Sequence, residues 1–213
     1  MRLAVHVRDL LVASWRTDAA SVARTLSYGL VPAEVAGEHL VSAVFFRYAG
    51  GRLGRLPVPP FSQLNLRVYT SWEGETAAYF LDVRVSPLGK LGALVFPVRA
   101  TRLRVRPGYA AGLGLRLAYD VAEPLDPGQL GAVELGLVPS GGLKALRVRR
   151  SAAEWRHAEL RERPGLDPLL ALGFDVGEPH SLLYCADSAL EVELPPRAVS
   201  STGATPSGRA QTP

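Results

Sequence analysis

The alternation of apolar and polar residues is clearest between positions 63 and 72, in the segment QLNLRVYTSW. Side chains of an extended strand point to opposite faces in turn, so Leu64, Leu66 and Val68 share one face of a predicted strand. The opposite face is polar and carries Gln63, Asn65, Arg67 and Tyr69. The segment EGE after this strand predicts a turn, and TAAYFLDVRVS predicts its antiparallel partner.

The chain before this hairpin predicts a strand, a helix and a second strand. Residues 2–15 are strand-like, and TDAASVARTLSYGL predicts a short amphipathic helix that Thr17 or Asp18 caps and Gly29 ends. HLVSAVFFRY at 39–48 predicts a buried strand. AGGRLGRLPVPP at 49–60 is rich in glycine and proline, so it predicts an irregular loop.

The chain after the hairpin predicts further strands and a second helical region. Strand-like sequence recurs in ALVFPVRATRLRVRPG, AGLGLRLAYDVAEP, VELGLVP and LKALRVRRS. Residues 151–173 predict helix, first in SAAEWRHAELRE and then in LDPLLALGF. HSLLYCADSALEVELPP predicts a last pair of strands, and the tail at 198–213 has no apolar period and is predicted to be disordered.

These elements predict a single α+β domain over residues 1–197. The connections between strands are too short for helical crossovers, which favours antiparallel pairing. So many strands must hide their edges, and closure of the sheet achieves this. We therefore expect a mainly antiparallel β-barrel or cone with a few short helices, and a cavity lined by the polar face of residues 63–69.

Composition places the chain among soluble globular proteins. Hydrophobic residues make up 47% and charged residues 21% of the 213 residues, and no apolar run approaches the roughly 20 residues that cross a bilayer. Asp9 interrupts the apolar centre that an export signal would need. The single cysteine, Cys185, excludes an internal disulfide and suits a reducing cytoplasm, which is the location we expect.

Several chemistries have no support in the sequence. The four histidines show no metal-ligand spacing, and neither a dinucleotide fingerprint nor a phosphate-binding loop is present, so no metal and no cofactor are predicted. The net charge of +4 permits contact with nucleic acid. Arg102, Arg104 and Arg106 would share a strand face and, with LKALRVRR, could form a basic stripe. Since aromatic residues do not interleave with them, a solvated face is favoured and nucleic-acid binding is kept as an alternative.

One lysine stands out, because the 24 basic residues are otherwise almost all arginine. Lys90 lies between two glycines in SPLGKLG, directly after the second strand of the hairpin. A hairpin would bring this segment near the polar face of the first strand, and near Arg8 if the sheet curls. That polar face could equally be the solvent side of an ordinary sheet, with Lys90 an exposed turn residue.

The order of three segments resembles the acetoacetate decarboxylase-like superfamily, most closely its YqjF-like bacterial branch. RDLLVASWRTDAASVARTLSYGLVP resembles the opening of that superfamily, and FSQLNLRVYTSWEGETAAYFLDVRV resembles the YqjF-like hairpin. SPLGKLG resembles the decarboxylase segment that carries two adjacent lysines before Leu-Gly. The resemblance covers roughly residues 8 to 100, and more loosely extends to about 195.

The resemblance implies a site and a reaction. In the decarboxylases the first lysine of the pair forms a Schiff base with a β-keto acid, and the second cation activates it. Here Gly89 takes the place of the first lysine and Lys90 that of the second. The active-site arginine corresponds to Arg8, and Gln63 replaces an active-site acid.

We therefore expect a protein that binds or transforms a small carbonyl or carboxylate compound in a barrel cavity. The resemblance implies Lys90 as the catalytic amine and Arg8 as the anion-binding residue. The polar strand face supplies the other expected substrate-binding residues, which are Gln63, Asn65, Arg67 and Tyr69. The alternatives are a non-catalytic ligand-binding or structural module, which could be a homo-oligomer, and a nucleic-acid-binding protein.

Overall fold

The computed structural model describes residues 2–53, 56–94, 97–125, 133–151, 153–193 and 196–199. Its helices are α1 (Ala19–Thr25), the 3₁₀ helix η1 (Pro87–Leu94) and α2 (Asp167–Ala171). Its strands are β1 (Arg2–Arg16), β2 (Val31–Pro32), β3 (Leu40–Leu53), β4 (Leu56–Val58), β5 (Phe61–Trp72), β6 (Glu75–Val85), β7 (Arg99–Ala100), β8 (Leu103–Arg106), β9 (Tyr109–Gly112), β10 (Leu115–Pro124), β11 (Leu135–Pro139), β12 (Leu143–Arg150), β13 (Trp155–Leu160), β14 (Gly165–Leu166), β15 (Ser181–Glu193) and β16 (Arg197–Ala198).

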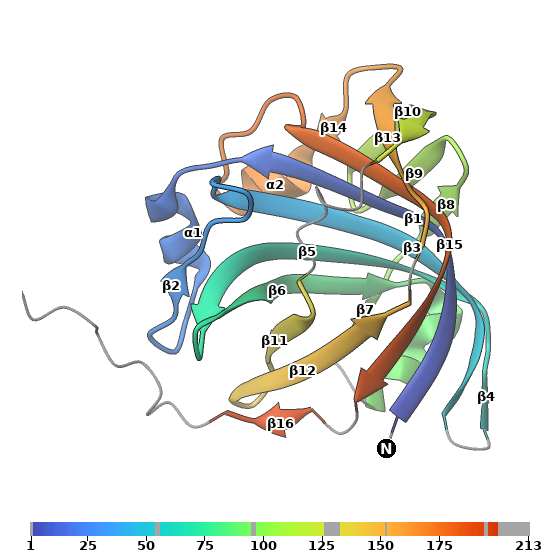
Figure 1. Ribbon diagram of the computed structural model, residues 1–213, viewed down its shortest axis with the longest axis horizontal. Coiled ribbons are helices and arrows are strands. Elements are labelled where there is room, and N and C mark those ends of the chain that lie inside the picture. The colour runs from blue at the N-terminus through green and yellow to red at the C-terminus, as the bar shows by residue number, and fades with distance from the viewer. Residues whose placement is uncertain are drawn as a thin grey trace, which may run out of the picture.

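Seven of these strands close into a barrel (Figure 1). Neighbours are hydrogen-bonded in the order β12, β11, β6, β5, β3, β1 and β15, and β15 pairs with β12 to complete the ring. Every pair in the ring is antiparallel except β11 with β6, which is parallel. The predicted α+β fold, dominated by a mainly antiparallel barrel with few helices, is confirmed.

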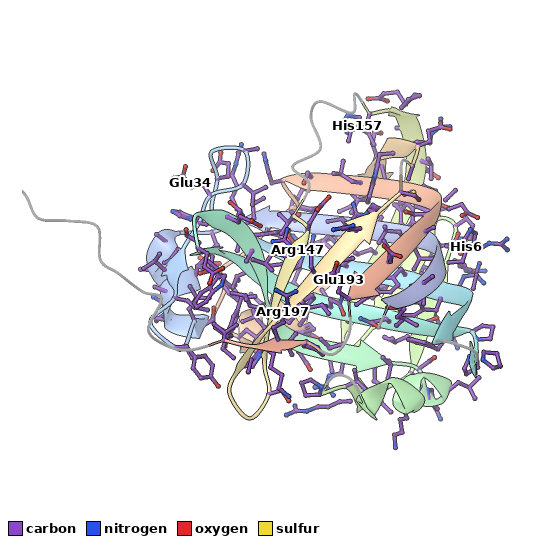
Figure 2. All side chains as sticks on the ribbon, turned by 60° about the horizontal axis from the view of Figure 1, so that its bottom comes forward. His6, Glu34, Arg147, His157, Glu193 and Arg197 are labelled. Carbon is purple, nitrogen blue, oxygen red and sulfur yellow. The ribbon has the colours of Figure 1, made fainter. Side chains whose placement is uncertain are left out.

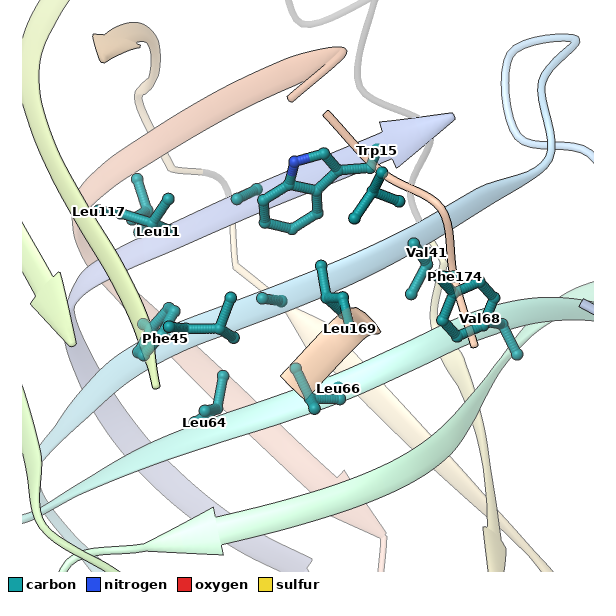
Figure 3. Packing of buried hydrophobic residues seen from close by; sticks show 14 of the residues in the cluster. Leu11, Trp15, Val41, Phe45, Leu64, Leu66, Val68, Leu117, Leu169 and Phe174 are labelled. Carbon is teal, nitrogen blue, oxygen red and sulfur yellow. The ribbon is translucent and has the colours of Figure 1, made fainter. Parts of the chain in front are cut away.

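A second layer covers one outer side of the barrel. Beyond β15 the sheet continues through β13, β10, β9 and β8, and these strands and α2 lie over β1, β3 and β5. Figure 3 shows Leu169 of α2 and Leu117 of β10 facing the wall residues of β1, β3 and β5. Trp15, Phe45 and Leu66 of the wall are each at most 1% exposed in this cluster. The main apolar core therefore lies between the barrel wall and its cover.

The same packing decides which strand faces line the inside of the barrel. On β3, Ala43 and Phe45 pack outward in the covered core, so Ser42, Val44 and Phe46 alternate to the inner face. Ser42 stands opposite Arg67 on β5, and Val44 stands opposite Asn65. The polar face of β5 therefore lines the barrel interior, while its apolar face packs under the cover.

The predicted early helix is confirmed as α1, and its start is settled in favour of Asp18. The Asp18 carboxylate accepts a hydrogen bond from the Ser21 amide at 2.7 Å, which satisfies a free donor of the first turn. Val22 is 1% exposed and packs into the covered core. The predicted end at Gly29 is wrong, because the helix ends at Thr25 with Leu26 as its C-cap. Gly29 lies in the turn that follows, with a positive φ of +69° that glycine adopts without strain.

Three predicted elements are wrong. Residues 155–160, expected to be helical, form β13, because Trp155 and His157 pair with β15 while the strand also pairs with β10. The expected last strand pair is the single long strand β15. Part of the expected loop at 49–60 belongs to a hairpin, since β3 runs on to Leu53 and pairs with β4.

The start of the expected tail is ordered against the barrel. Ala198 in β16 pairs with Lys144 of β12, and the Val199 amide donates to the Leu143 carbonyl at 2.9 Å. Residues 200–213 lie outside the described residues. Within the part of the chain that the structure describes, no helix has the length and apolar character needed to cross a membrane.

Candidate functional site

The polar face of β5 forms two hydrogen-bonded pairs on the inner side of the barrel. The Gln63 side-chain amide donates to the Asn65 carbonyl oxygen at 2.7 Å. The Arg67 Nε donates to the Tyr69 hydroxyl at 3.1 Å, and its guanidinium carbon lies 5.3 Å from the centre of the Tyr69 ring. Asn65 and Tyr69 are buried. These four predicted residues therefore share one strand face, on which they form two separate pairs. The two pockets described below lie elsewhere, so the cavity expected along this face stays a prediction.

Two serines extend this polar face across the neighbouring strands. The Tyr69 hydroxyl lies 3.1 Å from Ser42 Oγ on β3, and Ser42 Oγ lies 2.8 Å from Ser14 Oγ on β1. Both serines are almost completely buried. A hydrogen-bonded row therefore crosses three strands of the barrel wall and ends at the guanidinium of Arg67.

A second arginine, Arg150, ends β12 with an exposed side chain. Leu146 and Val148 of β12 pack with Val192 of β15, and Arg150 follows them on the same face of the strand. Its guanidinium carbon lies 5.0 Å from the centre of the Trp155 ring, close enough for a cation–π contact.

The electrostatics of Arg150 show what surrounds its charge. Burial lowers the pKa of Arg150, and the positive charge of Arg67 lowers it further. Tyr69, Cys185 and Glu134 act in the opposite direction. The positive charges of Arg150 and Arg67 therefore disfavour each other, and an anion bound to both would relieve that repulsion.

Neither arginine has a carboxylate partner among the residues that the structure describes. No carboxylate of those residues lies within 4.0 Å of Arg67 or Arg150. Glu134, which favours the charged form of Arg150, is exposed and lies beyond ion-pair distance. Arg149, the neighbour of Arg150 on the opposite face of β12, does pair with Glu193 at 3.8 Å.

Arg8 lies on the outer face of the barrel wall. Val7 is fully buried on the inner face, and Arg8 follows it with an exposed side chain whose Nε is 3.5 Å from Asp187. The next residue, Asp9, has a φ of +51° and marks an irregularity in the pairing of β1 with β3. The structure therefore does not group Arg8 with the interior residues, and its anion-binding role stays a prediction.

Asp9 itself belongs to a buried network on the covered side. Its carboxylate accepts a hydrogen bond from Arg47 Nε at 2.7 Å and one from the Tyr184 hydroxyl at 3.1 Å. The Tyr184 ring packs beside Tyr119 of β10, with ring centres 5.8 Å apart. This network joins the barrel wall to its cover rather than to the interior.

Lys90 is exposed on η1, the 3₁₀ helix that follows β6. Its neighbour Gly89 is buried, and a Cβ at that position would lie 2.7 Å from the Phe61 ring and 2.7 Å from Val85 Cβ. The hairpin does bring this segment beside β5, as predicted. The Ser86 amide donates a hydrogen bond to the Ser62 carbonyl of β5, and the Gly89 amide donates to the Ser86 carbonyl. The catalytic role of Lys90 stays a prediction, and its amine does not stand among the interior residues.

The arginine-rich strands do not form one stripe. Arg102 and Arg104 line an open groove of about 490 Å³ with Tyr109 and Arg116, on the outer layer formed by β8, β9 and β10. LKALRVRR is β12, a strand of the barrel ring itself. The tertiary structure therefore separates the two basic segments that the sequence could have combined.

A smaller pocket of about 150 Å³ lies on the barrel wall beneath β16. Arg147, Glu193 and Arg197 line it and lie close to one another in Figure 2. Arg147 already donates to both carboxylate oxygens of Glu75 at 3.3 Å. His6 and His157 lie in separate parts of the same view, and no group of three potential metal ligands exists among the described residues.

Sequence reasoning missed Arg150, Trp155, Ser14 and Ser42. The sequence pattern assigns Arg150 to a basic stripe and Trp155 to a helix. The serines did carry a signal, since each interrupts an apolar strand segment, in LLVASW and HLVSAVFF. A hydroxyl in a strand buried on both faces needs a hydrogen-bond partner, which predicts a polar neighbour.

The sequence matches a family model over residues 4–110, half of the chain. That family is DUF2071, described as an uncharacterized conserved protein (COG2071). The chain belongs to this family. The matched segment holds β1, β3, β5 and β6, so the DUF2071 match includes the polar strand face and both interior serines. No curated protein matches the chain.

Solved structures share the fold of this DUF2071 protein. MppR, an enduracididine biosynthesis enzyme complexed with pyruvate, is 15% identical with a TM-score of 0.61, covering 93% of this chain and 91% of its own. An acetoacetate decarboxylase-like enzyme from Sphingomonas wittichii RW1 is 15% identical with a TM-score of 0.63, covering 93% and 92%. Acetoacetate decarboxylase from Legionella pneumophila is 13% identical with a TM-score of 0.64, covering 93% and 87%. These matches confirm the barrel fold that the resemblance implied.

Proposed function

We propose that this DUF2071 protein binds a small carbonyl or carboxylate compound inside its barrel, with Arg67 and Arg150 holding the anionic group. The two guanidiniums supply planar donors that match a carboxylate. Tyr69 and Asn65 add hydrogen-bonding groups, and Trp155 and Phe46 add apolar surface, which is the usual composition of a small-molecule site.

The single observation that carries this proposal is that Arg67 on β5 and the exposed Arg150 on β12, whose charges disfavour each other, have no carboxylate partner among the described residues. Two like charges that repel each other cost free energy, and a bound anion offsets that cost. The pyruvate bound to MppR, a protein of the same fold, indicates that such a barrel accommodates a compact keto acid. A cytoplasmic location, which the single cysteine favours, and self-association remain parts of the proposal.

Titration calorimetry with pyruvate tests the proposal, with methyl pyruvate as the neutral counterpart that lacks the carboxylate. We expect pyruvate to bind and its ester to bind about tenfold more weakly, because the charge-assisted hydrogen bonds are lost. Arg150→Gln should weaken pyruvate binding by about tenfold or more. Arg149→Gln is the matched control, since this side chain lies one residue away and points to the opposite face.

Two results would contradict the proposal. Equal affinities for pyruvate and methyl pyruvate would show that the carboxylate is not what the site recognises. Equal losses in Arg149→Gln and Arg150→Gln would show that only the overall charge of the protein matters. If neither compound binds, the non-catalytic structural module becomes the better description.

A Schiff-base reaction at Lys90 would be a separate catalytic extension, which the exposed lysine does not favour. Nucleic-acid binding is the competing function. The groove lined by Arg102, Arg104 and Tyr109 favours the competitor, because it places an aromatic ring beside arginines. A mobility shift of single-stranded DNA that weakens steeply with salt, and that Arg104→Gln reduces, would favour the groove.

A further inference from the structure

Three buried hydroxyl groups form a row that ends at the interior arginine. Ser14, Ser42 and Tyr69 lie on β1, β3 and β5, and they are 4%, 0% and 4% exposed. The oxygens are separated by 2.8 Å between the serines and by 3.1 Å between Ser42 and Tyr69. Arg67 Nε completes the row at 3.1 Å from the Tyr69 oxygen.

The pairing register of the strands places these groups next to one another directly. Ser14 stands directly opposite Ser42, and Ser42 stands directly opposite Arg67. Tyr69 lies two residues from Arg67 on the same face of β5. The backbone hydrogen bonds between the three adjacent strands therefore hold these four side chains side by side, which gives the row a fixed geometry.

The row contains three hydroxyl hydrogens, and its direction decides where the last of them points. If Ser14 donates to Ser42 and Ser42 donates to Tyr69, the tyrosine oxygen accepts from Ser42 and from Arg67 Nε. The Tyr69 hydrogen is then free for a ligand oxygen. If the row runs the other way, Tyr69 donates to Ser42 and offers the ligand no hydrogen. A ligand that accepts hydrogen bonds therefore selects the first direction.

We propose that Ser14 and Ser42 are positioning residues for the carboxylate site. The two serines fix the orientation of the Tyr69 hydroxyl. The Tyr69 oxygen accepts the hydrogen bond from Arg67 Nε, which leaves both Nη groups of Arg67 free to bind the anion. The Tyr69 hydrogen then donates to a second oxygen of the ligand. This inference rests on the proposed function, because it assigns roles around the same ligand. It adds two residues of β1 and β3 that do not themselves touch the ligand.

Ser42→Ala removes the centre of the row and tests the inference. Pyruvate affinity should fall about tenfold, since Tyr69 loses its fixed donor and Arg67 loses orientation. Ser14→Ala, which removes the far end, should cost less. Thr70→Val is the matched control, because it deletes a buried hydroxyl that bonds the Val31 carbonyl on the opposite face of β5. It should leave the affinity within about twofold.

A second readout needs no ligand. The Arg67 Nε–H proton, observed by NMR and assigned with Arg67→Lys, should exchange slowly with water in the wild-type protein because it is bonded to Tyr69. Exchange should become several-fold faster in Ser42→Ala and stay unchanged in Thr70→Val. If Ser42→Ala does not fold, Ser14→Ala gives the same two readouts at smaller amplitude.

The outcomes separate this inference from the proposed function. If wild-type protein binds pyruvate, but Ser42→Ala binds it equally well with unchanged Arg67 exchange, the serines only fill space and the inference is overturned. If wild-type protein binds no carboxylate, the proposed function fails, and the exchange measurement alone decides whether the row orients Arg67. Loss of affinity together with faster exchange, in Ser42→Ala and not in Thr70→Val, supports the inference.

Discussion

The guanidinium of Arg150 lies over the ring of Trp155, with 5.0 Å between the guanidinium carbon and the ring centre. Arg150 ends β12 and Trp155 begins β13, so the short segment between these strands brings the cation and the ring together. The contact connects the end of β12, a strand of the barrel ring, to β13, the strand on which the outer layer begins. A ligand that binds Arg150 should therefore change the fluorescence of the Trp155 indole.

Tryptophan fluorescence should report ligand binding through this contact. Pyruvate is expected to change the emission of the wild-type protein as it draws the guanidinium away from the Trp155 ring. Trp155→Phe should abolish the change, while Trp72→Phe, at the outer-wall pocket, should keep it. A pyruvate-dependent signal that persists in Trp155→Phe would place the ligand elsewhere.

Reductive trapping should show no preference for Lys90. An amine becomes a nucleophile in a protein when burial or a neighbouring cation activates it, and the Lys90 side chain is exposed. After incubation with acetoacetate and borohydride, peptide mass spectrometry should find no more adduct on Lys90 than on Lys144. A strong excess on Lys90 that Lys90→Arg removes would instead establish the Schiff-base extension of the proposed function.

The packing of η1 on β5 predicts that Gly89→Ala destabilises the fold. The added methyl group would lie 2.7 Å from the Phe61 ring and 2.7 Å from Val85 Cβ, so the wall must shift. We expect a loss of about 1–3 kcal/mol in the free energy of unfolding, measured with urea. Gly177→Ala is the control, because no atom lies within 4 Å of its Cβ position. Similar losses in both variants would refute this explanation.

The network around Asp9 predicts a loss of stability at alkaline pH. Burial, and next the charge of Asp9, raise the pKa of Tyr184 from 10.0 to about 12. Above pH 10 the unfolded chain releases this proton while the folded protein keeps it, so the free energy of unfolding falls as pH rises from 10 to 12. Below pH 10 this tyrosine contributes no pH dependence.

Tyr184→Phe tests this prediction, because phenylalanine cannot ionise in either state. Urea unfolding between about pH 9 and about pH 11 should show a shallower decline than in the wild-type protein. Tyr28→Phe, which removes an exposed hydroxyl, serves as the control. An identical decline in wild type and Tyr184→Phe would assign the alkaline sensitivity to other groups. Tyr119, whose pKa burial also raises, is the next candidate.

Local sequence predicted the elements whose signals are complete within a few residues. The alternation from Gln63 to Tyr69 specified a strand and the identity of its two faces, and EGE specified the turn that follows. Asp18 specified the start of α1 because its capping bond reaches only three residues ahead. The resemblance extended the prediction from single elements to the whole barrel, because the order of such segments is characteristic of the superfamily that the chain resembles.

Long-range pairing decided what the local signals left open. WRHAEL has apolar residues three apart, a spacing that fits a helix, yet Trp155 and Ala158 are buried in β13 because both neighbouring strands offer backbone partners. Arg150 could not be recognised as an electrostatic neighbour of Arg67, because the two strands that carry them come together only when the ring closes.

The sequence by itself determined that β5 has one apolar and one polar face, since alternation is a property of the extended backbone. Only the tertiary structure decided that the polar face lies inside. The choice depends on the outer layer of β8–β10 and α2, which gives the apolar face of β5 a place to be buried and turns the opposite face toward the centre of the barrel. The direction in which a sheet curls is set by what covers it, and those covering residues are distant in the chain.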